Sequence, residues 1–224
     1  MKNQLPILCT VAILGTAAQA AVVGVNDSSA PWLGYMNVFE LPENGGGFVF
    51  GSSWGLADLS ASFNDGAGTM TMSPNTIGDP DPFWYQGGGA PGAAGNKIMD
   101  ANIYQQVDDG SLSGTTVTFE GMIASNTFTD AHNARVFIRD FAADFSSSVD
   151  VYVDATAGAF SISLDTIADG TRHVQWGVQV QGVNVWATDI APFGSVVFNT
   201  IPAPGSVALL GLGGLVATRR RRNA

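Results

Sequence analysis

The sequence predicts an all-β fold: an antiparallel sandwich of two facing sheets, with a jelly roll as the favoured topology. Apolar and polar residues alternate through many short segments, which is the period of a half-buried strand. Turn-forming residues separate these segments, and the chain has 28 glycines while only 12% of its residues are charged. No stretch of the body shows a sustained 3.6-residue apolar period with capping signals, so we expect no helix there.

The expected strands lie between residues 32 and 198. The clearest hairpin joins residues 56–63 to 68–72 through Asn64-Asp65-Gly66, because an Asp-Gly pair favours a tight turn. Many of the other segments are rich in Val, Phe, Ile and Thr, which suit a pleated and half-buried surface. These other strands are expected at residues 32–41, 98–107, 115–124, 134–141, 149–153, 160–164, 173–180, 183–187 and 196–198.

One segment interrupts this series. Residues 73–96 are rich in glycine and proline, and we expect them to form a long surface loop rather than a linker. Loops of this length are uncommon in compact domains and often carry function. Because there is no internal repeat and no shift in composition, residues 21–200 are expected to form one β-sandwich domain.

The N-terminus has the organisation of a secretory signal peptide. Lys2 precedes an apolar run from Leu5 to Ala18, and Ala18-Gln19-Ala20 has the A-x-A pattern of a cleavage site. We therefore expect residues 1–20 to form a separate signal helix. Its partners would be the translocation machinery and signal peptidase, which cuts after Ala20.

The C-terminus combines a Pro-x-Pro element with an apolar run and a cluster of positive charge. Pro202-Ala203-Pro204 is followed by 11 small or apolar residues at 207–217. Spanning a bilayer as a helix takes roughly 20 apolar residues, so this short apolar helix is a weak membrane stop. The four arginines that follow favour the cytoplasmic side of a membrane; they are Arg219, Arg220, Arg221 and Arg222.

This order resembles the PEP-CTERM sorting signal of Gram-negative bacteria, although Ala203 stands where that family usually has Glu. The resemblance implies that residues 201–224 are a sorting tail. An exosortase would recognise the tail and process it near Pro202 to Pro204 while the inner membrane holds it transiently. The implied destination is the cell surface or the extracellular matrix.

Charge and cysteine content exclude several classes of function. Between the two end segments only Lys97, Arg135, Arg139 and Arg172 are basic, against 19 acidic residues, which is a formal charge of −15. So acidic a body repels nucleic acid, and we expect no nucleic-acid partner. The single cysteine, Cys9, lies in the signal peptide, so the predicted domain has neither a disulfide nor a thiolate nucleophile.

The sequence shows no convincing catalytic centre. Gly51-Ser52-Ser53-Trp54-Gly55 matches the G-x-S-x-G pattern, but that chemistry needs a strand, a sharp turn and a helix. The residues that follow Ser53 alternate with the period of a strand. His132 and His173 have no metal-ligand spacing and are expected to face solvent. We therefore predict no catalytic residue and no enzyme, with an extracellular hydrolase as the least favoured alternative.

No cofactor is required by the sequence, and structural calcium is the one candidate. Calcium takes six to eight oxygen ligands from carboxylates and loop carbonyls. Asp65, Asp79 and Asp81 lie in acidic turns that supply such oxygens, but none of these turns has EF-hand spacing. The alternative is that they are ordinary solvated turns.

Three adjacent rings, Phe83, Trp84 and Tyr85, lie in the expected long loop between prolines and glycines. The apolar faces of sugar rings stack on such side chains, so this loop is a candidate carbohydrate platform. The alternative is that Phe83 and Trp84 close one end of the sandwich, because large rings are usually buried.

The body also loosely resembles jelly-roll carbohydrate-binding modules and galactose-binding-like domains, through residues 112–121, 134–141 and 176–198. The resemblance is one of strand order and not of a diagnostic motif. Together these observations predict a secreted, exosortase-sorted, non-catalytic β-sandwich protein of the envelope or exopolysaccharide matrix. The alternative function is a carbohydrate-binding module, whose partner would be an extracellular polysaccharide.

Overall fold

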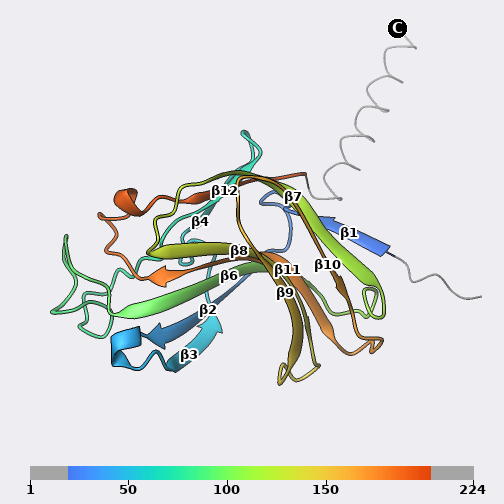
Figure 1. Cartoon of the computed structure of the whole chain (residues 1–224), viewed down its shortest axis with the longest axis horizontal. Coiled ribbons are helices and arrows are strands. Elements are labelled where there is room, and N and C mark those ends of the chain that lie inside the picture. Colours follow the sequence, from blue (N-terminus) through green and yellow to red (C-terminus); the bar gives the residue numbers. More distant parts are fainter. Residues whose placement is uncertain (1–19, 203–224) are drawn as a thin grey trace, which may run out of the picture.

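The structure, a computed structural model, describes residues 20–202 (Figure 1). Within this range the chain forms strands and two short 3-10 helices, η1 (Pro42–Asn44) and η2 (Ala191–Phe193), without an α-helix. No helix among these residues is long and apolar enough to cross a membrane. The strands are β1 (Ala20–Gly24), β2 (Leu33–Glu40), β3 (Phe48–Ser53), β4 (Ala61–Asn64), β5 (Thr69–Met72), β6 (Lys97–Val107), β7 (Thr116–Asn126), β8 (His132–Phe141), β9 (Ser148–Asp154), β10 (Gly158–Asp165), β11 (His173–Val183) and β12 (Val196–Asn199).

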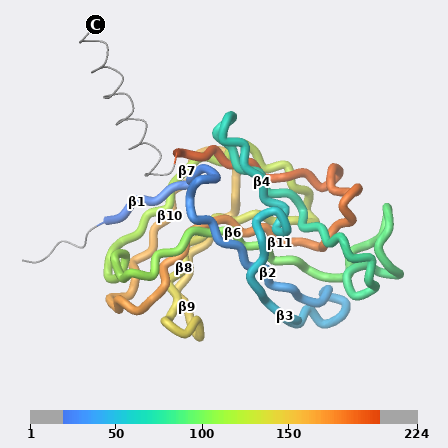
Figure 2. Tube along the Cα trace, turned by 180° about the vertical axis from the view of Figure 1, so that it is seen from behind, coloured from blue at the N-terminus to red at the C-terminus, as the bar shows by residue number. Residues whose placement is uncertain are grey.

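The strands form two sheets of six. In the first sheet, β7 pairs with β10 along one edge, and with β1 and β12 along the other. The hairpin of β4 and β5 continues this sheet beyond β12. The second sheet has the order β3-β2-β6-β11-β8-β9, and all its neighbours are antiparallel. Figure 2 shows β4 and β7 of the first sheet above β2, β3 and β9 of the second.

One hydrophobic core fills the space between the two sheets. Met36 and Ile103 of the second sheet, and Phe119 and Phe198 of the first, have no exposed surface and belong to the same cluster. Each comes from a strand whose alternate residues face outward, as expected when one face of a sheet is buried. The prediction of an all-β protein with two facing sheets is therefore confirmed.

The expected strands agree with the structure except at four places, one of which is β3, a strand that was not among those expected. Residues 56–60 form turns instead of a strand, because the chain folds back to bury Leu59, whose amide donates to the Gly55 carbonyl. Residues 184–187 leave the sheet after β11. Strand β1 was not predicted, since Ala20 was assigned to the end of the signal segment. The long loop at 73–96 lies between β5 and β6 as expected, and the Asn64-Asp65-Gly66 turn joins β4 to β5.

Candidate functional site

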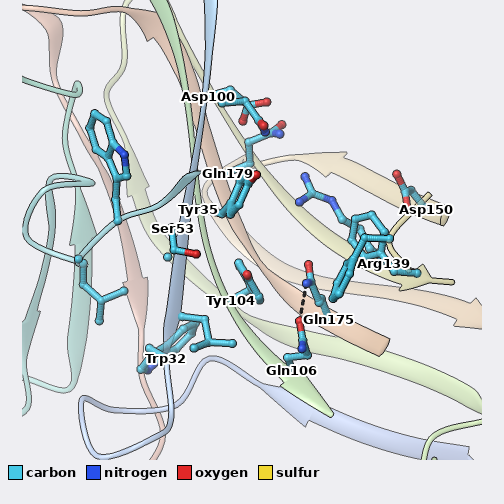
Figure 3. A pocket seen from close by; sticks show the side chains of 18 of the residues that line it. Trp32, Tyr35, Ser53, Asp100, Tyr104, Gln106, Arg139, Asp150, Gln175 and Gln179 are labelled. Atoms are coloured by element: carbon cyan, nitrogen blue, oxygen red, sulfur yellow. Dashed lines mark hydrogen bonds between the residues drawn. The ribbon is translucent and has the colours of Figure 1, made fainter. Parts of the chain in front are cut away.

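A pocket of about 980 Å³ opens on the outer face of the second sheet, the face that points away from the core (Figure 3). We call it the outer-face pocket. Its floor comes from β2, β6, β8 and β11, while β9 and the loop before it form one side and the end of β3 forms the other. The lining residues are Trp32, Leu33, Gly34, Tyr35, Asn37, Ser53, Trp54, Gly55, Leu56, Asp100, Tyr104, Gln106, Arg139, Phe141, Phe145, Asp150, Tyr152, Gln175 and Gln179.

Alternation along β6 shows how the sequence builds this pocket. Met99 and Ile103 point into the core, so Asp100, Tyr104 and Gln106 project to the opposite face. The outward positions from Asp100 to Gln106 carry polar or aromatic side chains, whereas most inward positions are apolar. The strand therefore supplies core and pocket from alternate residues.

The register of the sheet places an aromatic row across the pocket. Tyr104 on β6 lies opposite Gly177 on β11, which in turn pairs with Phe137 on β8 and, beyond it, Tyr152 on β9. Gly177 is required at the centre, because an added Cβ would lie 2.7 Å from the Tyr104 Cα. Leu33 on β2 completes the row opposite Tyr104.

A polar row runs beside the aromatic one. Gln106, Gln175, Arg139 and Asp150 occupy paired positions on β6, β11, β8 and β9. Gln175 Nε2 donates to Gln106 Oε1 at 2.6 Å, so these two amides hold each other in place. No described residue donates to Gln175 Oε1, which leaves this oxygen as an acceptor next to the pocket.

Arg139 is the one cation among the residues that line the pocket, and two of its five N–H groups donate to protein acceptors. Its Nε donates to the Tyr152 hydroxyl at 2.8 Å and its Nη2 to Asn102 Oδ1 at 2.8 Å. The guanidinium lies 3.9 Å from the centre of the Phe137 ring, a cation–π contact. Only 9% of Arg139 is exposed. It therefore fixes the positions of its neighbours across three strands.

A second polar row, on the other side of the aromatic one, contains Tyr35, Asn102 and Gln179. Gln179 Nε2 donates to Asn102 Oδ1 at 3.2 Å, and Asn102 Nδ2 donates to Asp100 Oδ1 at 2.9 Å. Burial raises the pKa of Asp100 above its ordinary value, although the positive charge of Arg139 works against that shift.

The loop between β8 and β9 forms part of the rim. Phe145, with a φ of 57°, stacks on the His173 ring at 4.3 Å between centroids. His173 contacts Asp108 Oδ1 through Nδ1 at 2.7 Å and the Ala143 carbonyl through Nε2 at 3.2 Å. The hydrogen bond to Asp108 raises the pKa of His173. Both ring nitrogens face acceptors, which favours the doubly protonated imidazolium.

The three loop rings do not lie on one exposed surface. Tyr85 is fully buried, and its hydroxyl donates to the Ile77 carbonyl at 2.8 Å. Trp84 is half-buried and packs edge-on against Phe50. Phe83 is 37% exposed and lies under the Lys97 ammonium. Trp84 and Tyr85 thus serve mainly to attach the loop to the sandwich, and none of the three lines the outer-face pocket.

Two of the three candidate calcium ligands, Asp79 and Asp81, cap local turns, whereas Asp65 binds Ser28, which lies 37 positions away. Asp65 accepts hydrogen bonds from the amide and hydroxyl of Ser28 at 3.1 and 2.5 Å. Asp79 accepts from the Asp81 amide, and Asp81 accepts from the Phe83 amide. Among residues 20–202 no group of three or more His, Cys, Asp or Glu side chains is arranged to hold a metal ion.

The serine and the histidines are placed in different surroundings. Ser53 lines the pocket, but turns and not a helix follow it. The expectation that His132 faces solvent is wrong: it is 7% exposed and stacks on Phe128. Its Nε2 donates to the Val183 carbonyl at 2.9 Å, and burial lowers its pKa. The nearby Gly182 leaves space for the ring, since a Cβ there would lie 2.7 Å from its Cγ.

The residues expected to direct export lie mostly outside the described part of the chain. Ala20 is the first described residue and begins β1, and Pro202 is the last. The other residues of the expected signal and sorting segments are outside that range: Ala18, Ala203, Pro204, Arg219, Arg220, Arg221 and Arg222.

No protein-family model matches this sequence, and comparison with curated proteins finds no match either. Of the pocket residues, the sequence analysis singled out only Ser53, Trp54 and Gly55, in the G-x-S-x-G pattern. It did not single out the side chains of the polar and aromatic rows, although all of the strands that carry the pocket floor were expected. The outward residues of β6 are the signal that was available: three of them line the pocket, Asp100, Tyr104 and Gln106.

Proposed function

We propose that this chain is an exported, non-catalytic protein that binds carbohydrate in the outer-face pocket. The observation that carries the proposal is the aromatic row through Tyr104 and Tyr152, with polar rows on both sides. Aromatic rings present apolar faces to the C–H faces of a sugar ring. Side-chain amides both donate and accept hydrogen bonds, as sugar hydroxyls do.

The polar side chains of the two rows are held in fixed positions, which supports a role in ligand binding rather than as an ordinary solvent-exposed surface. Gln175 is 4% exposed and Asn102 is 1% exposed, although both point away from the core. Each is held by a neighbour, so little side-chain entropy remains to be lost when a ligand is bound. A pocket that combines apolar rings with a few fixed polar groups is typical of small-molecule and cofactor sites.

The proposal includes the route by which the protein reaches its ligand. Residues 1–20 would direct export, and an exosortase would process residues 201–224 near Pro202 to Pro204. The protein would then act at the cell surface or in the exopolysaccharide matrix of a Gram-negative-type bacterium. The two sheets, which are antiparallel except for the parallel pair of β1 and β7, also support a jelly roll as the finer description of the fold.

Affinity electrophoresis against a panel of soluble polysaccharides tests the binding. We expect at least one polymer to retard the protein, and Tyr104→Ala and Gln175→Ala to weaken that retardation at least about tenfold, because stacking or a buried amide is lost. Thr118→Ala, on the outer face of the first sheet, is the matched control and should behave like the wild type. Urea unfolding of each variant shows whether it is folded.

Two results would contradict the proposal. One is that no polymer of the panel retards the protein. The other is that Trp84→Ala abolishes retardation while folded Tyr104→Ala leaves it unchanged, which would assign binding to the loop.

Export is tested separately by the intact mass of the protein from its native host. We expect loss of residues 1–20 and of the tail, and a steady-state species that retains Arg219 to Arg222 would contradict processing.

A further inference from the structure

We infer that the outer-face pocket selects an uncharged glycan chain that lies across the strands, and that it rejects acidic polysaccharides. This inference rests on the proposed carbohydrate function and names the class of ligand for the same site. It follows from three features of the pocket: its charges, the geometry of Arg139 and the arrangement of its amides.

The charges that line the pocket do not favour an anion. Its carboxylates are Asp100 and Asp150, and the one cation among its lining residues is Arg139. Asp108, which accepts from Gln106 Nε2 at 2.8 Å, adds a third carboxylate just beyond the lining. Two like charges in a partly desolvated site repel more strongly than in water. A ligand carboxylate would therefore meet a net negative site on an acidic domain.

Arg139 compensates only in part for this repulsion, because one edge of its guanidinium is already occupied. A guanidinium binds a carboxylate best through two parallel N–H groups on one edge. In this pocket the edge formed by Nε and Nη2 donates to the Tyr152 hydroxyl and to Asn102 Oδ1. One face of the same group covers Phe137. A ligand carboxylate could form a bidentate pair with that edge only by breaking these contacts. Only the edge formed by Nη1 and Nη2 keeps N–H groups without an acceptor among the described residues.

Neutral groups, in contrast, are available along the whole pocket. Gln175 and Gln179 keep acceptor oxygens to which no described residue donates, and Asn37 adds another amide on β2. The aromatic row runs across the strands from β2 to β9, which is four strand spacings or roughly 19 Å, and the two polar rows flank parts of it. That length accommodates several linked sugar rings, with their hydroxyls next to the amides.

The inference is tested with matched polymers. Neutral glucans, galactans and mannans are compared by affinity electrophoresis with the same polymers after oxidation of their C6 hydroxymethyl groups to carboxylates. We expect the oxidised form of the bound polymer to bind at least tenfold more weakly than the neutral form. Binding of the neutral form should change little between low and high salt, because no ligand charge is screened.

A variant that removes one carboxylate from the pocket tests whether charge repulsion is the reason why the oxidised polymer binds weakly. Asp150→Asn should raise the affinity for the oxidised polymer relative to the affinity for the neutral polymer about severalfold, by removing one repelling charge. Asp165→Asn removes an equal charge from the outer face of the first sheet, where Asp165 is exposed, and should change neither. Equal gains in both variants would show a general charge effect and overturn the role of the pocket.

The outcomes separate this inference from the proposed function. Stronger binding of the oxidised polymer, with affinity that falls as salt rises, would overturn the neutral-ligand inference while carbohydrate binding stands. If neither form retards the wild-type protein, both fail. Retention of the neutral form with loss of the oxidised form supports both.

Discussion

The outer faces of the two sheets follow the same alternation but carry different side chains. On the first sheet, β7 and β10 present short hydroxyls that bond in pairs, such as Thr118 Oγ1 and Ser163 Oγ at 2.9 Å. On the second sheet, long amides and Arg139 connect several strands. The first face is mostly exposed, whereas outward-pointing Asn102 and Gln179 of the second are buried.

This difference shows where to look for function on a β-sandwich. Short Ser and Thr side chains satisfy each other and leave a mostly exposed face. Long polar side chains that point outward and yet lie buried need fixed partners, because an unpaired buried polar group costs roughly 1–3 kcal/mol. They leave ordered polar atoms beside exposed rings, which is the arrangement a ligand can use.

The largest expected effect comes from a charge buried under the second sheet. Asp140 is fully buried, accepts from Arg172 Nε at 2.8 Å and from the Ile167 amide at 2.7 Å. Asp140→Ala should lower the free energy of unfolding by about 3–5 kcal/mol, because it leaves Arg172 without its buried partner. Asp165→Ala on the first sheet should cost less than about 1 kcal/mol. Urea unfolding measures both, and similar losses would remove the contrast between the sheets.

A central glycine of each sheet provides the next comparison. A Cβ at Gly177 would meet the Ile103 carbonyl and the Tyr104 backbone, neither of which can move without disturbing the β6–β11 ladder. Gly177→Ala should therefore cost about 2 kcal/mol. At Gly121 the nearest atoms are the edge of the Phe160 ring at 2.9 Å, and a side chain can turn. Gly121→Ala should have the smaller effect on the melting temperature; the reverse order would contradict this packing.

A comparison of two arginines of β8 tests how much the hydrogen-bond network of Arg139 stabilises the second sheet. Arg139→Lys keeps the charge but cannot donate to both Tyr152 and Asn102, so we expect a loss of about 1–2 kcal/mol. Arg135 bridges Asp154 at 3.2 Å with both side chains largely exposed. Arg135→Lys should stay within about 0.5 kcal/mol of the wild type. Equal effects in urea unfolding would mean that the Arg139 network adds no stability.

The smallest expected effect depends on pH. The pKa of His173 is raised in the folded protein, so protonated His173 stabilises the fold. This stabilisation is fully present below the unfolded pKa of about 6.5 and is lost as pH rises through the pKa of the folded state. Burial works against ionised Asp108, but hydrogen bonds from Gln106 and His173 outweigh it and lower its pKa. The Asp108 contribution is therefore lost only as pH falls below about 4.

His173→Gln should thus destabilise the protein by less than about 1 kcal/mol at pH 5.5 and by clearly less at pH 8.5. The difference between variant and wild type is the quantity to measure by urea unfolding. It cancels the opposite pH dependence of His132, whose pKa is lowered by burial and which destabilises the fold on protonation. A difference that does not change with pH would show that the contact with Asp108 is unimportant.

Local patterns allowed much of the fold to be predicted. Alternation identified the segments that became β2, β6, β7, β8 and β11, because a strand with one buried face must place apolar residues at every second position. The same rule failed at residues 56–60, where a turn buries Leu59 with the same spacing. The alternation of apolar and polar residues shows which side chains are buried. It does not show whether a strand or a turn buries them.

The sequence alone determined the all-β class, the acidic charge, the single core and which residues of each strand point outward. Only the tertiary structure decided which outward residues meet. Asn102 contacts Arg139 and Gln179, which are 37 and 77 positions away. Tyr85 looks exposed in a glycine-rich loop, yet it is buried through contacts with Ile77 and Val185, the latter 100 positions away. Strand pairing joins segments that are distant in the sequence, and the local propensity of a strand carries no information about which strand it pairs with. The pocket therefore forms only when the strands of the second sheet come together.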